Sequence, residues 1–289
     1  MRWDNFRTSS NVEDRRGSRI PGGKGGLGIG TIIILFLISW GLGIDPRLLI
    51  GGAEMLSGGG SQQQQQQVGR QGAPDDQVGR FASAVLGNTE DVWKTVFPQQ
   101  IGKPYQNPKL VLFSNATRSG CGFAQSAMGP FYCPLDQTVY IDLTFFQEMQ
   151  QRFRAGGDFA YAYVIAHEVG HHVEKQLGVL DAAQQRQRQL GGPEANKISV
   201  RVELMADCLA GVWAHHSNTQ YKSLEPGDIE KAIAAAEAIG DDRLQKQSQG
   251  YAVPDSFTHG SSAQRVRWLQ QGLKTGDVNS CNTFQADNL

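Results

Sequence analysis

The sequence predicts an α+β domain preceded by one transmembrane helix. Two segments rich in β-branched and aromatic residues, 109–115 and 137–143, come before a series of helical patterns. Strands followed by helices favour an α+β fold over alternating βαβ units. An uncharged apolar segment lies ahead of both strands. With 289 residues, 39% of them hydrophobic, the chain is long enough for one sizeable core with appendages.

Residues 27–44 are predicted to form the transmembrane helix, because they carry no charge and approach the roughly 20 residues that a membrane span needs. The positive-inside rule then makes residues 1–26 a cytoplasmic basic tail and places everything after the helix in the periplasm. A cleaved signal peptide is the alternative, but no A-x-A cleavage site follows the apolar run. We expect an uncleaved single-pass anchor in the inner (plasma) membrane. The basic residues of the tail are Arg2, Arg7, Arg15, Arg16, Arg19 and Lys24.

Residues 45–74 are rich in glycine and glutamine and predict a flexible linker. The folded domain, 75–289, is expected to begin where apolar residues return at helical spacing, as in Phe81, Ala82 and Val85. A formal net charge of -1 gives no reason to expect a nucleic-acid partner. Further helices are predicted over 144–154, 158–177, 198–216, 228–247 and 262–273.

The four cysteines lack C-x-x-C spacing, which argues against a zinc ribbon. All four follow the apolar segment, and an even number in an oxidising compartment favours two disulfides, with buried thiols as the alternative. Sequence alone allows three connectivities. The short glycine-rich loop between Cys121 and Cys133 favours that pair, which leaves Cys208 with Cys281.

The predicted helix 158–177 contains the motif His167-Glu168-Val169-Gly170-His171. Residues four apart stack on one helical face, so His167 and His171 can reach one metal ion. Glu168 lies about 100° around the axis and can contact a metal-bound water without occupying a coordination position. A carboxylate there can accept the proton of a water whose pKa zinc has lowered. The motif therefore predicts a hydrolytic zinc site, and the alternative is a helix whose histidines are merely exposed.

A catalytic zinc site needs a third protein ligand and an open fourth position. A metzincin would have Gly at 174 and His at 177, whereas this chain has Glu174 and Leu177, so that class is excluded. Glu203 and Asp207 lie four residues apart on the apolar predicted helix 198–216. We expect Glu203 to ligate zinc and Asp207 to accept the second ring N–H of a zinc-bound histidine. The alternative is an ordinary helix with two exposed acids.

Three other histidines are not expected to be metal ligands. His172 follows His171 directly and points off the ligand face, which suggests a surface or supporting role. His215 and His216 lie three turns beyond Glu203, about 18 Å away, and so cannot share its metal. Their place near a helix C-terminus suits an interaction with the helix dipole.

HEVGH followed by ELMAD resembles the gluzincin pattern HExxH…ExxxD of thermolysin-like peptidases and membrane CaaX-type zinc endopeptidases. The three motifs HEVGHHVE, ELMADCLAGVW and THGSSAQRVRW together resemble the bacterial neutral zinc metallopeptidase family of single-anchor proteins. The resemblance covers essentially the whole chain. The resemblance implies a compact zincin fold, with a small sheet above the motif helix and the Glu203 helix packed against it. By analogy of fold, the strand Val139–Leu143 is expected to hold an extended peptide by β-augmentation.

The resemblance also gives His259 a catalytic role. The corresponding region of related zinc peptidases carries a histidine that donates to the developing oxyanion. Membrane relatives often have His-Pro followed by an arginine, whereas here Gly260 replaces the proline and Arg265 remains. A structural loop histidine is the alternative. The helix after it begins with a predicted capping box, Ser261 with Gln264.

These patterns predict a membrane-tethered, extracytoplasmic zinc metallopeptidase that acts on a peptide or protein. The first alternative is a non-catalytic zinc-containing binding protein of the cell envelope. Glu168 argues against it, because a purely structural zinc needs four protein ligands and no base. A second alternative, hydrolysis of another amide such as one in cell-wall material, is not separated from peptide hydrolysis by any feature of the sequence.

Overall fold

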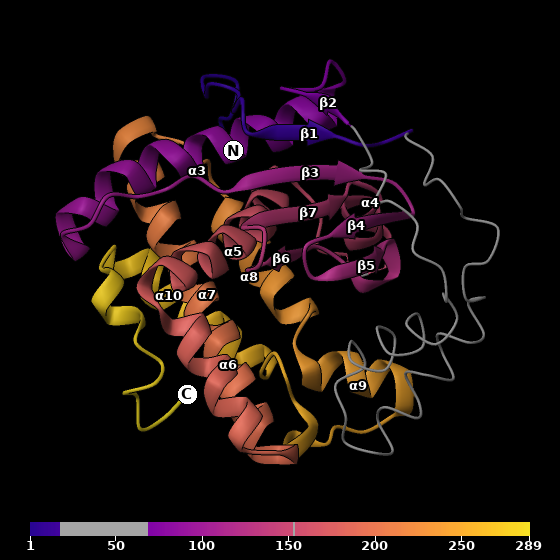
Figure 1. The fold of residues 1–289 in the computed structure, drawn as a ribbon, viewed down its shortest axis with the longest axis vertical. Helices are drawn as coiled ribbons and strands as arrows, with labels where there is room; N and C mark the ends of the chain where they lie inside the picture. Colours follow the sequence, from indigo (N-terminus) through magenta and orange to yellow (C-terminus); the bar gives the residue numbers. More distant parts are fainter. Residues whose placement is uncertain (18–68, 153) are drawn as a thin grey trace, which may run out of the picture.

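A computed structural model describes residues 1–17, 69–152 and 154–289, which form a five-stranded sheet covered on one face by helices, and a separate two-stranded hairpin (Figure 1). The sheet has the strand order β2-β1-β3-β7-β6. Its members are β1 (Val12–Asp14), β2 (Arg70–Gln71), β3 (Lys109–Phe113), β6 (Phe131–Cys133) and β7 (Thr138–Asp142). Strand β3 pairs in parallel with β1 and β7, whereas β6 and β2 are antiparallel to their neighbours. The predicted α+β class is confirmed, and the two predicted strands are β3 and β7.

Strand β7 lies inside the sheet, because β3 pairs with one of its edges and β6 with the other. All five of its residues are buried. The expectation that Val139–Leu143 binds a peptide by β-augmentation is therefore wrong, since this strand has no free edge. The free edge on this side of the sheet belongs to β6. Beyond β3 the chain forms a separate hairpin of β4 (Ala116–Ser119) and β5 (Gly122–Gln125).

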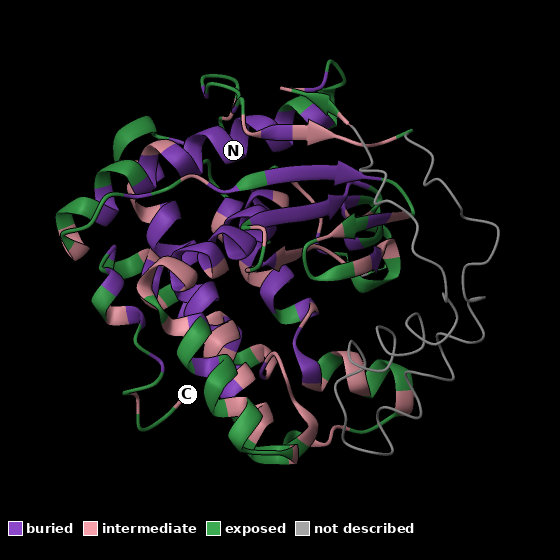
Figure 2. Ribbon diagram, in the orientation of Figure 1, coloured by how far each residue is buried: buried purple, intermediate pink, exposed green. Residues whose placement is uncertain are grey.

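Most of the core lies between the sheet and the helices, where Figure 2 shows the buried surfaces facing one another. Large buried side chains such as Trp93, Tyr163 and Trp213 fill this layer. Their removal from water is the main source of stability for the domain. The helices are α3 (Gln77–Ile101), α4 (Thr144–Gln151), α5 (Asp158–Leu177), α6 (Val179–Gln189), α7 (Gly192–Tyr221), α8 (Asp228–Ala238), α9 (Asp241–Gln249) and α10 (Ser262–Thr275).

The helical predictions differ from the structure in two places. The segment predicted as one helix over 228–247 is divided into α8 and α9, with Gly240 between them. A side chain at Gly240 would lie 2.5 Å from Ser262 Oγ, so the chain turns there with its backbone against the start of α10. Helix α6 was not predicted, because it is short and strongly polar and shows only a weak apolar period.

The N-terminal residues belong to the same domain as the helices. Val12 pairs with Leu110 in the sheet, and Arg7 binds Glu90 and Asp91 of α3 at 2.7 Å each. Arg16 is likewise paired, with Asp76. Arg7 and Arg16, which the positive-inside rule counted as evidence for a cytoplasmic tail, thus form ion pairs within the folded domain.

The predicted localisation, a single-pass inner-membrane protein with its N-terminus in the cytoplasm and its domain outside, is therefore wrong. Residues 1–17 pack against α3 and β3 and cannot lie across a membrane from them. No helix within residues 1–17, 69–152 or 154–289 is long and apolar enough to span a membrane. The segment 27–44, on which the prediction depended, and most of the linker 45–74 lie outside the described residues.

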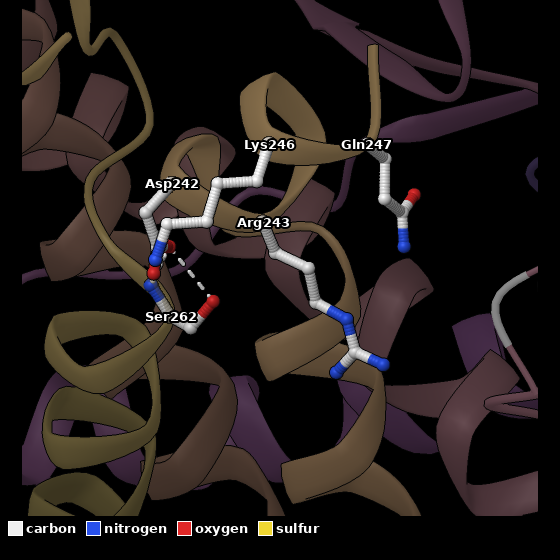
Figure 3. Close-up of a pocket in the computed structure, with 5 residues that line it drawn as sticks. All are labelled: Asp242, Arg243, Lys246, Gln247 and Ser262. Carbon is white, nitrogen blue, oxygen red and sulfur yellow. Dashed lines mark hydrogen bonds between the residues drawn. The ribbon is translucent and has the colours of Figure 1, made fainter. Parts of the chain in front are cut away.

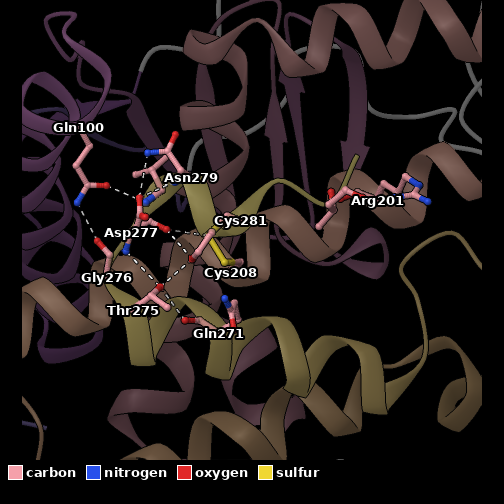
Figure 4. Close-up of a disulfide and its surroundings, with 12 residues drawn as sticks. Gln100, Arg201, Cys208, Gln271, Thr275, Gly276, Asp277, Asn279 and Cys281 are labelled. Carbon is pink, nitrogen blue, oxygen red and sulfur yellow. Dashed lines mark hydrogen bonds between the residues drawn. A yellow bond between two sulfur atoms is a disulfide. The ribbon is translucent and has the colours of Figure 1, made fainter. Parts of the chain in front are cut away.

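Both predicted disulfides are present. Cys121–Cys133 joins the β4–β5 hairpin to β6, and Cys208–Cys281 joins α7 to the short 3-10 helix η3 (Val278–Cys281). Figure 4 shows the second bridge beside Gln100 of α3, which bonds Gly276 O and Val278 N. The bridge and these bonds hold the chain after α10 against α7 and α3.

Helices α7 and α10 approach so closely that their backbones are nearly in contact. A side chain at Gly272 would overlap the carbonyl oxygen of Cys208, and one at Gly211 would overlap that of Leu269. Glycine on both helices therefore allows a crossing that no larger residue permits. This crossing determines where the N-terminal half of α10 lies relative to α7.

We predict that Gly272→Ala lowers the free energy of unfolding by about 3 kcal/mol, because the added methyl forces the helices apart. In an ordinary helix, replacing glycine by alanine raises stability by about 1 kcal/mol. A loss of stability in Gly272→Ala would therefore indicate the backbone contact and not helix propensity. Gly191→Ala is the control and should change stability by less than about 1 kcal/mol, since no atom lies within 4 Å of its Cβ position. Urea unfolding of the three proteins makes the comparison, and equal stabilities would contradict the account.

Candidate metal centre

Helix α5 presents His167 and His171 on one face, four residues apart. The helix ends at Gly178, which is left-handed at φ 80° and closes the last turn. The imidazole Nε2 atoms of His167 and His171 lie 3.1 and 3.7 Å from Glu203 Oε2 of α7. One ligand atom from each of the three residues lies within 4.8 Å of the others. The structure thus brings together the three side chains predicted to hold zinc.

The two helices meet at Gly170, between the histidines. A side chain there would lie 2.9 Å from the carbonyl oxygen of Ala206 and 3.1 Å from its Cα. Glycine at this position of the motif lets the backbones of α5 and α7 approach closely. Glu203, one turn before Ala206, consequently reaches the face of α5 that carries the imidazoles.

Asp207 is fully buried behind His167 and both of its oxygens are bonded. Its Oδ1 accepts from His167 Nδ1 at 2.8 Å and from the Tyr163 hydroxyl at 2.6 Å. Arg265 of α10 donates to Oδ2 at 2.8 Å and to Oδ1 at 2.9 Å. Burial raises the pKa of Asp207, but Arg265 and His167 outweigh it and hold this pKa at about 2. The carboxylate therefore stays charged, and a His167 Nδ1–H that donates to it leaves Nε2 free for a metal.

Glu174 stands behind the other histidine, a position that the sequence analysis missed. His171 Nδ1 lies 2.8 Å from Glu174 Oε2, and Glu174 is completely buried. The sequence could have predicted this contact, because His171 and Glu174 are three residues apart and such residues are neighbours on a helix. Glu174 had been considered only as a residue that excludes the metzincin pattern. Each candidate histidine ligand thus has its own carboxylate.

Glu168, the predicted base, lies on the same helix and is 7% exposed. Among the described residues its carboxylate has no hydrogen-bond partner, in contrast to Glu174 and Asp207. A carboxylate without a protein partner at the edge of a metal site is available to a water molecule. The position and the free oxygens are consistent with the predicted role, which stays a prediction.

His259 lies in the loop before α10, with 43% of its side chain exposed. Its Nδ1 lies 3.2 Å from Asp241 Oδ1, and Asp241 Oδ2 also accepts the backbone N–H groups of Thr258, His259 and Gly260. Burial lowers the pKa of His259, but the charges of Glu203 and Asp241 raise it further, so the net shift is upward. The charge of Glu203, a candidate metal ligand, therefore contributes to the raised pKa of His259.

Gly260 explains why the proline of the related motif is missing. Its φ is +93°, which a proline fixed near -65° cannot adopt. The predicted capping box of Ser261 and Gln264 is present immediately afterwards. The loop therefore turns through Gly260 directly into α10, and Arg265 lies in the first turns of that helix.

The remaining histidines have structural contacts. His172 is buried between the Tyr132 hydroxyl, at 2.9 Å, and the backbone oxygen of Gln106, at 2.7 Å. Burial lowers its pKa to about 4, so it is neutral. His215 and His216 bond the carbonyl oxygens of Leu273 and Gly276. They therefore meet the C-terminal end of a helix as expected, but this helix is α10 and not their own.

A shallow hollow lies elsewhere, at the junction of α9 and α10 (Figure 3). Ser262 bonds Asp242 Oδ1 there, at 2.8 Å, and exposed basic side chains surround the pair. None of its lining residues belongs to the metal site. Its polar groups serve the start of α10, and we assign it no ligand.

Residues 1–284 match the model of a protein family described as "Putative neutral zinc metallopeptidase". The chain belongs to this family. It is 50% identical to "Uncharacterized protein YpfJ" of Escherichia coli K12 over 98% of this chain and 99% of the relative. It is 46% identical to "Uncharacterized protein Mb2605" of Mycobacterium bovis over 76% of this chain and 75% of the relative. No solved structure matches the chain.

Membership of the neutral zinc metallopeptidase family implies zinc, and the residues present fit that metal. Two imidazoles and one carboxylate are the donor set of several catalytic zinc sites, which leave the fourth position open. His167, His171 and Glu203 supply this set, with one ligand atom of each within 4.8 Å of the others.

We predict that Arg265→Gln lowers the free energy of unfolding by about 3 to 5 kcal/mol, because it leaves the buried charge of Asp207 uncompensated. Arg267→Gln is the matched control on the same helix. Arg267 is exposed, so its replacement should change stability by no more than about 0.5 kcal/mol. Chemical denaturation of both variants measures the free energy of unfolding. An equal loss of stability in the two variants would show that the Arg265–Asp207 pair does not stabilise the fold more than an exposed arginine does.

Proposed function

We propose that this chain hydrolyses peptide bonds in a zinc-dependent reaction. The observation that carries the proposal is the convergence of His167, His171 and Glu203 beside a glutamate, Glu168, that has no partner among the described residues. Three protein ligands and a free carboxylate are what zinc-assisted hydrolysis requires. A structural zinc would need a fourth protein ligand and no base, so a non-catalytic binding protein is the weaker candidate.

Zinc held by these three side chains would lower the pKa of a bound water and polarise the scissile carbonyl. Glu168 would accept the proton of the attacking water and return it to the leaving amine. Asp207 and Glu174 would keep the two imidazoles oriented with Nε2 toward the metal. Each of these roles follows from the position of a side chain on α5 or α7.

His259 would donate a hydrogen bond to the oxyanion that forms on the carbonyl. Its exposure lets substrate reach it, and Asp241 fixes the ring by accepting from Nδ1. The three backbone bonds to Asp241 make the loop rigid at this point. The buried carboxylate of Asp241 therefore holds both the histidine and its loop in place.

The free edge of β6 is the candidate surface for an extended peptide. This strand is tied to α5 by the Tyr132 hydroxyl, which bonds His172, the residue next to His171. Cys133 of the same strand is fixed to the β4–β5 hairpin by its disulfide. An edge strand held rigidly beside the metal helix can bind the backbone of a substrate through main-chain hydrogen bonds.

The first test separates ligands from base. We predict that Glu203→Gln loses most bound zinc, whereas Glu168→Gln keeps about one zinc per chain and loses about 10² to 10⁴-fold in kcat. Asp207→Ala should fall between them, with a loss of about 10 to 100-fold in zinc affinity or activity. Metal analysis and cleavage of a peptide library give both readouts. Full zinc and full activity in Glu203→Gln would refute the assignment of the third ligand.

The second test concerns His259. We predict that His259→Ala lowers kcat by about 10² to 10³-fold while zinc content stays unchanged, because the residue acts on the oxyanion and not on the metal. His216→Ala is the control, since His216 bonds the end of α10 and should leave kcat unaffected. Steady-state kinetics on one cleaved peptide measures the effect. An unchanged kcat in His259→Ala would make His259 a structural loop residue.

A further inference from the structure

Glu174 is a completely buried carboxylate next to a candidate metal ligand, and it has a single hydrogen-bond partner among the described residues. Its Oε2 accepts one hydrogen bond, from His171 Nδ1. Its Oε1 is buried and has no hydrogen-bond partner within the described part of the chain. A carboxylate removed from water with one of its oxygens unpaired is costly unless a positive charge lies near it.

Asp207 provides the comparison. It holds the equivalent place behind His167, but Arg265 donates two hydrogen bonds to it and Tyr163 donates a third. No lysine or arginine among the described residues forms an ion pair with Glu174, whose salt-bridge partner is His171. Arg265 balances the charge of Asp207, whereas Glu174 is paired with His171 alone, an imidazole that must be neutral to ligate zinc.

We propose that Glu174 is the positioning residue of His171 and that zinc itself supplies the charge that makes its burial favourable. A His171 Nδ1–H that donates to Glu174 leaves Nε2 unprotonated and directed at the metal position. Zinc bound at Nε2 places positive charge on the far side of the same ring. Glu174 thereby couples occupancy of the site to the stability of α5.

This coupling has a signature that a merely structural glutamate lacks. Without zinc, Glu174 makes one hydrogen bond and keeps one buried oxygen unpaired, so its removal costs the protein little. With zinc bound, the same removal loses the support of a ligand. The variant should therefore weaken zinc binding and reduce the stabilisation that zinc confers, while changing the stability of the metal-free protein little.

The experiment uses the full chain with Glu174→Gln and Glu174→Leu. Zinc affinity is measured by competition with a chelator, and melting temperature is measured with zinc and after metal removal. We expect Glu174→Leu to bind zinc about 10 to 100-fold more weakly than wild type and Glu174→Gln to lose less, because its amide oxygen still accepts from His171. If the leucine variant does not fold, the glutamine variant alone decides the matter.

Glu90→Gln is the matched control. Glu90 is also buried, but its carboxylate is bonded by Arg7, Ser9 and Asn11, and it contacts none of the candidate metal ligands. Its replacement should lower the melting temperature equally with and without zinc and leave zinc affinity unchanged. The proposal is overturned if Glu174→Gln and Glu174→Leu bind zinc within twofold of wild type, or if they destabilise the metal-free protein as much as the zinc-bound one.

This inference rests on the metal site of the proposed function but not on peptide cleavage. A wild-type chain that binds zinc and cleaves no peptide would overturn the proposed function alone. Unaltered zinc binding in the Glu174 variants of an active enzyme would overturn the inference alone. A wild-type chain without affinity for zinc would overturn both.

Discussion

The contact between Gly170 of α5 and Ala206 of α7 determines the geometry of the whole site. The ligands come from two helices, so their separation depends on how closely the helix axes approach. With a Cβ position 2.9 Å from the Ala206 carbonyl oxygen, residue 170 admits no side chain without moving α7. A second glycine crossing, of α7 with α10, then brings Arg265 to Asp207. The metal ligands and their supporting charges are thus placed by two backbone contacts in succession.

The charges around the site follow from that geometry. Glu203, Asp207 and Glu174 gather around two imidazoles, and Arg265 balances Asp207 within the protein. The remaining negative charge is suited to a cation at the centre. Because the surrounding side chains are buried, electrostatic interactions there are stronger than at the surface. With both imidazoles neutral, as metal ligands must be, a divalent ion would balance the charges of Glu203 and Glu174.

Local patterns predicted the parts of the site that lie on one helix, and the apolar strands β3 and β7. The motif from His167 to His171 needs only helical periodicity, and the same holds for Glu203 with Asp207. Glu174 was equally local but was overlooked because its spacing was compared with another class of peptidase. The partners supplied by other elements, Arg265 for Asp207 and Asp241 for His259, depend on contacts between helices that no local pattern encodes.

The structure of the N-terminal segment could not be predicted from local patterns. Val12–Asp14 is too short and too polar to be predicted as a strand, and it becomes one because the edge of β3 is available. Its arginines suggested membrane topology when they were counted as charges, whereas Arg7 and Arg16 pair with acids of the folded domain. A rule based on charge counts cannot distinguish a basic tail from a segment whose charges are neutralised by tertiary contacts.

The most direct test of the central claim is anomalous diffraction at the zinc absorption edge from crystals of the zinc-loaded protein. The account predicts one peak per chain bonded to His167 Nε2, His171 Nε2 and Glu203, with ligand distances of about 2.0 to 2.2 Å. The fourth position should hold a water within hydrogen-bond distance of Glu168. A peak at another place, or a fourth protein ligand that closes the coordination shell, would contradict a hydrolytic zinc site.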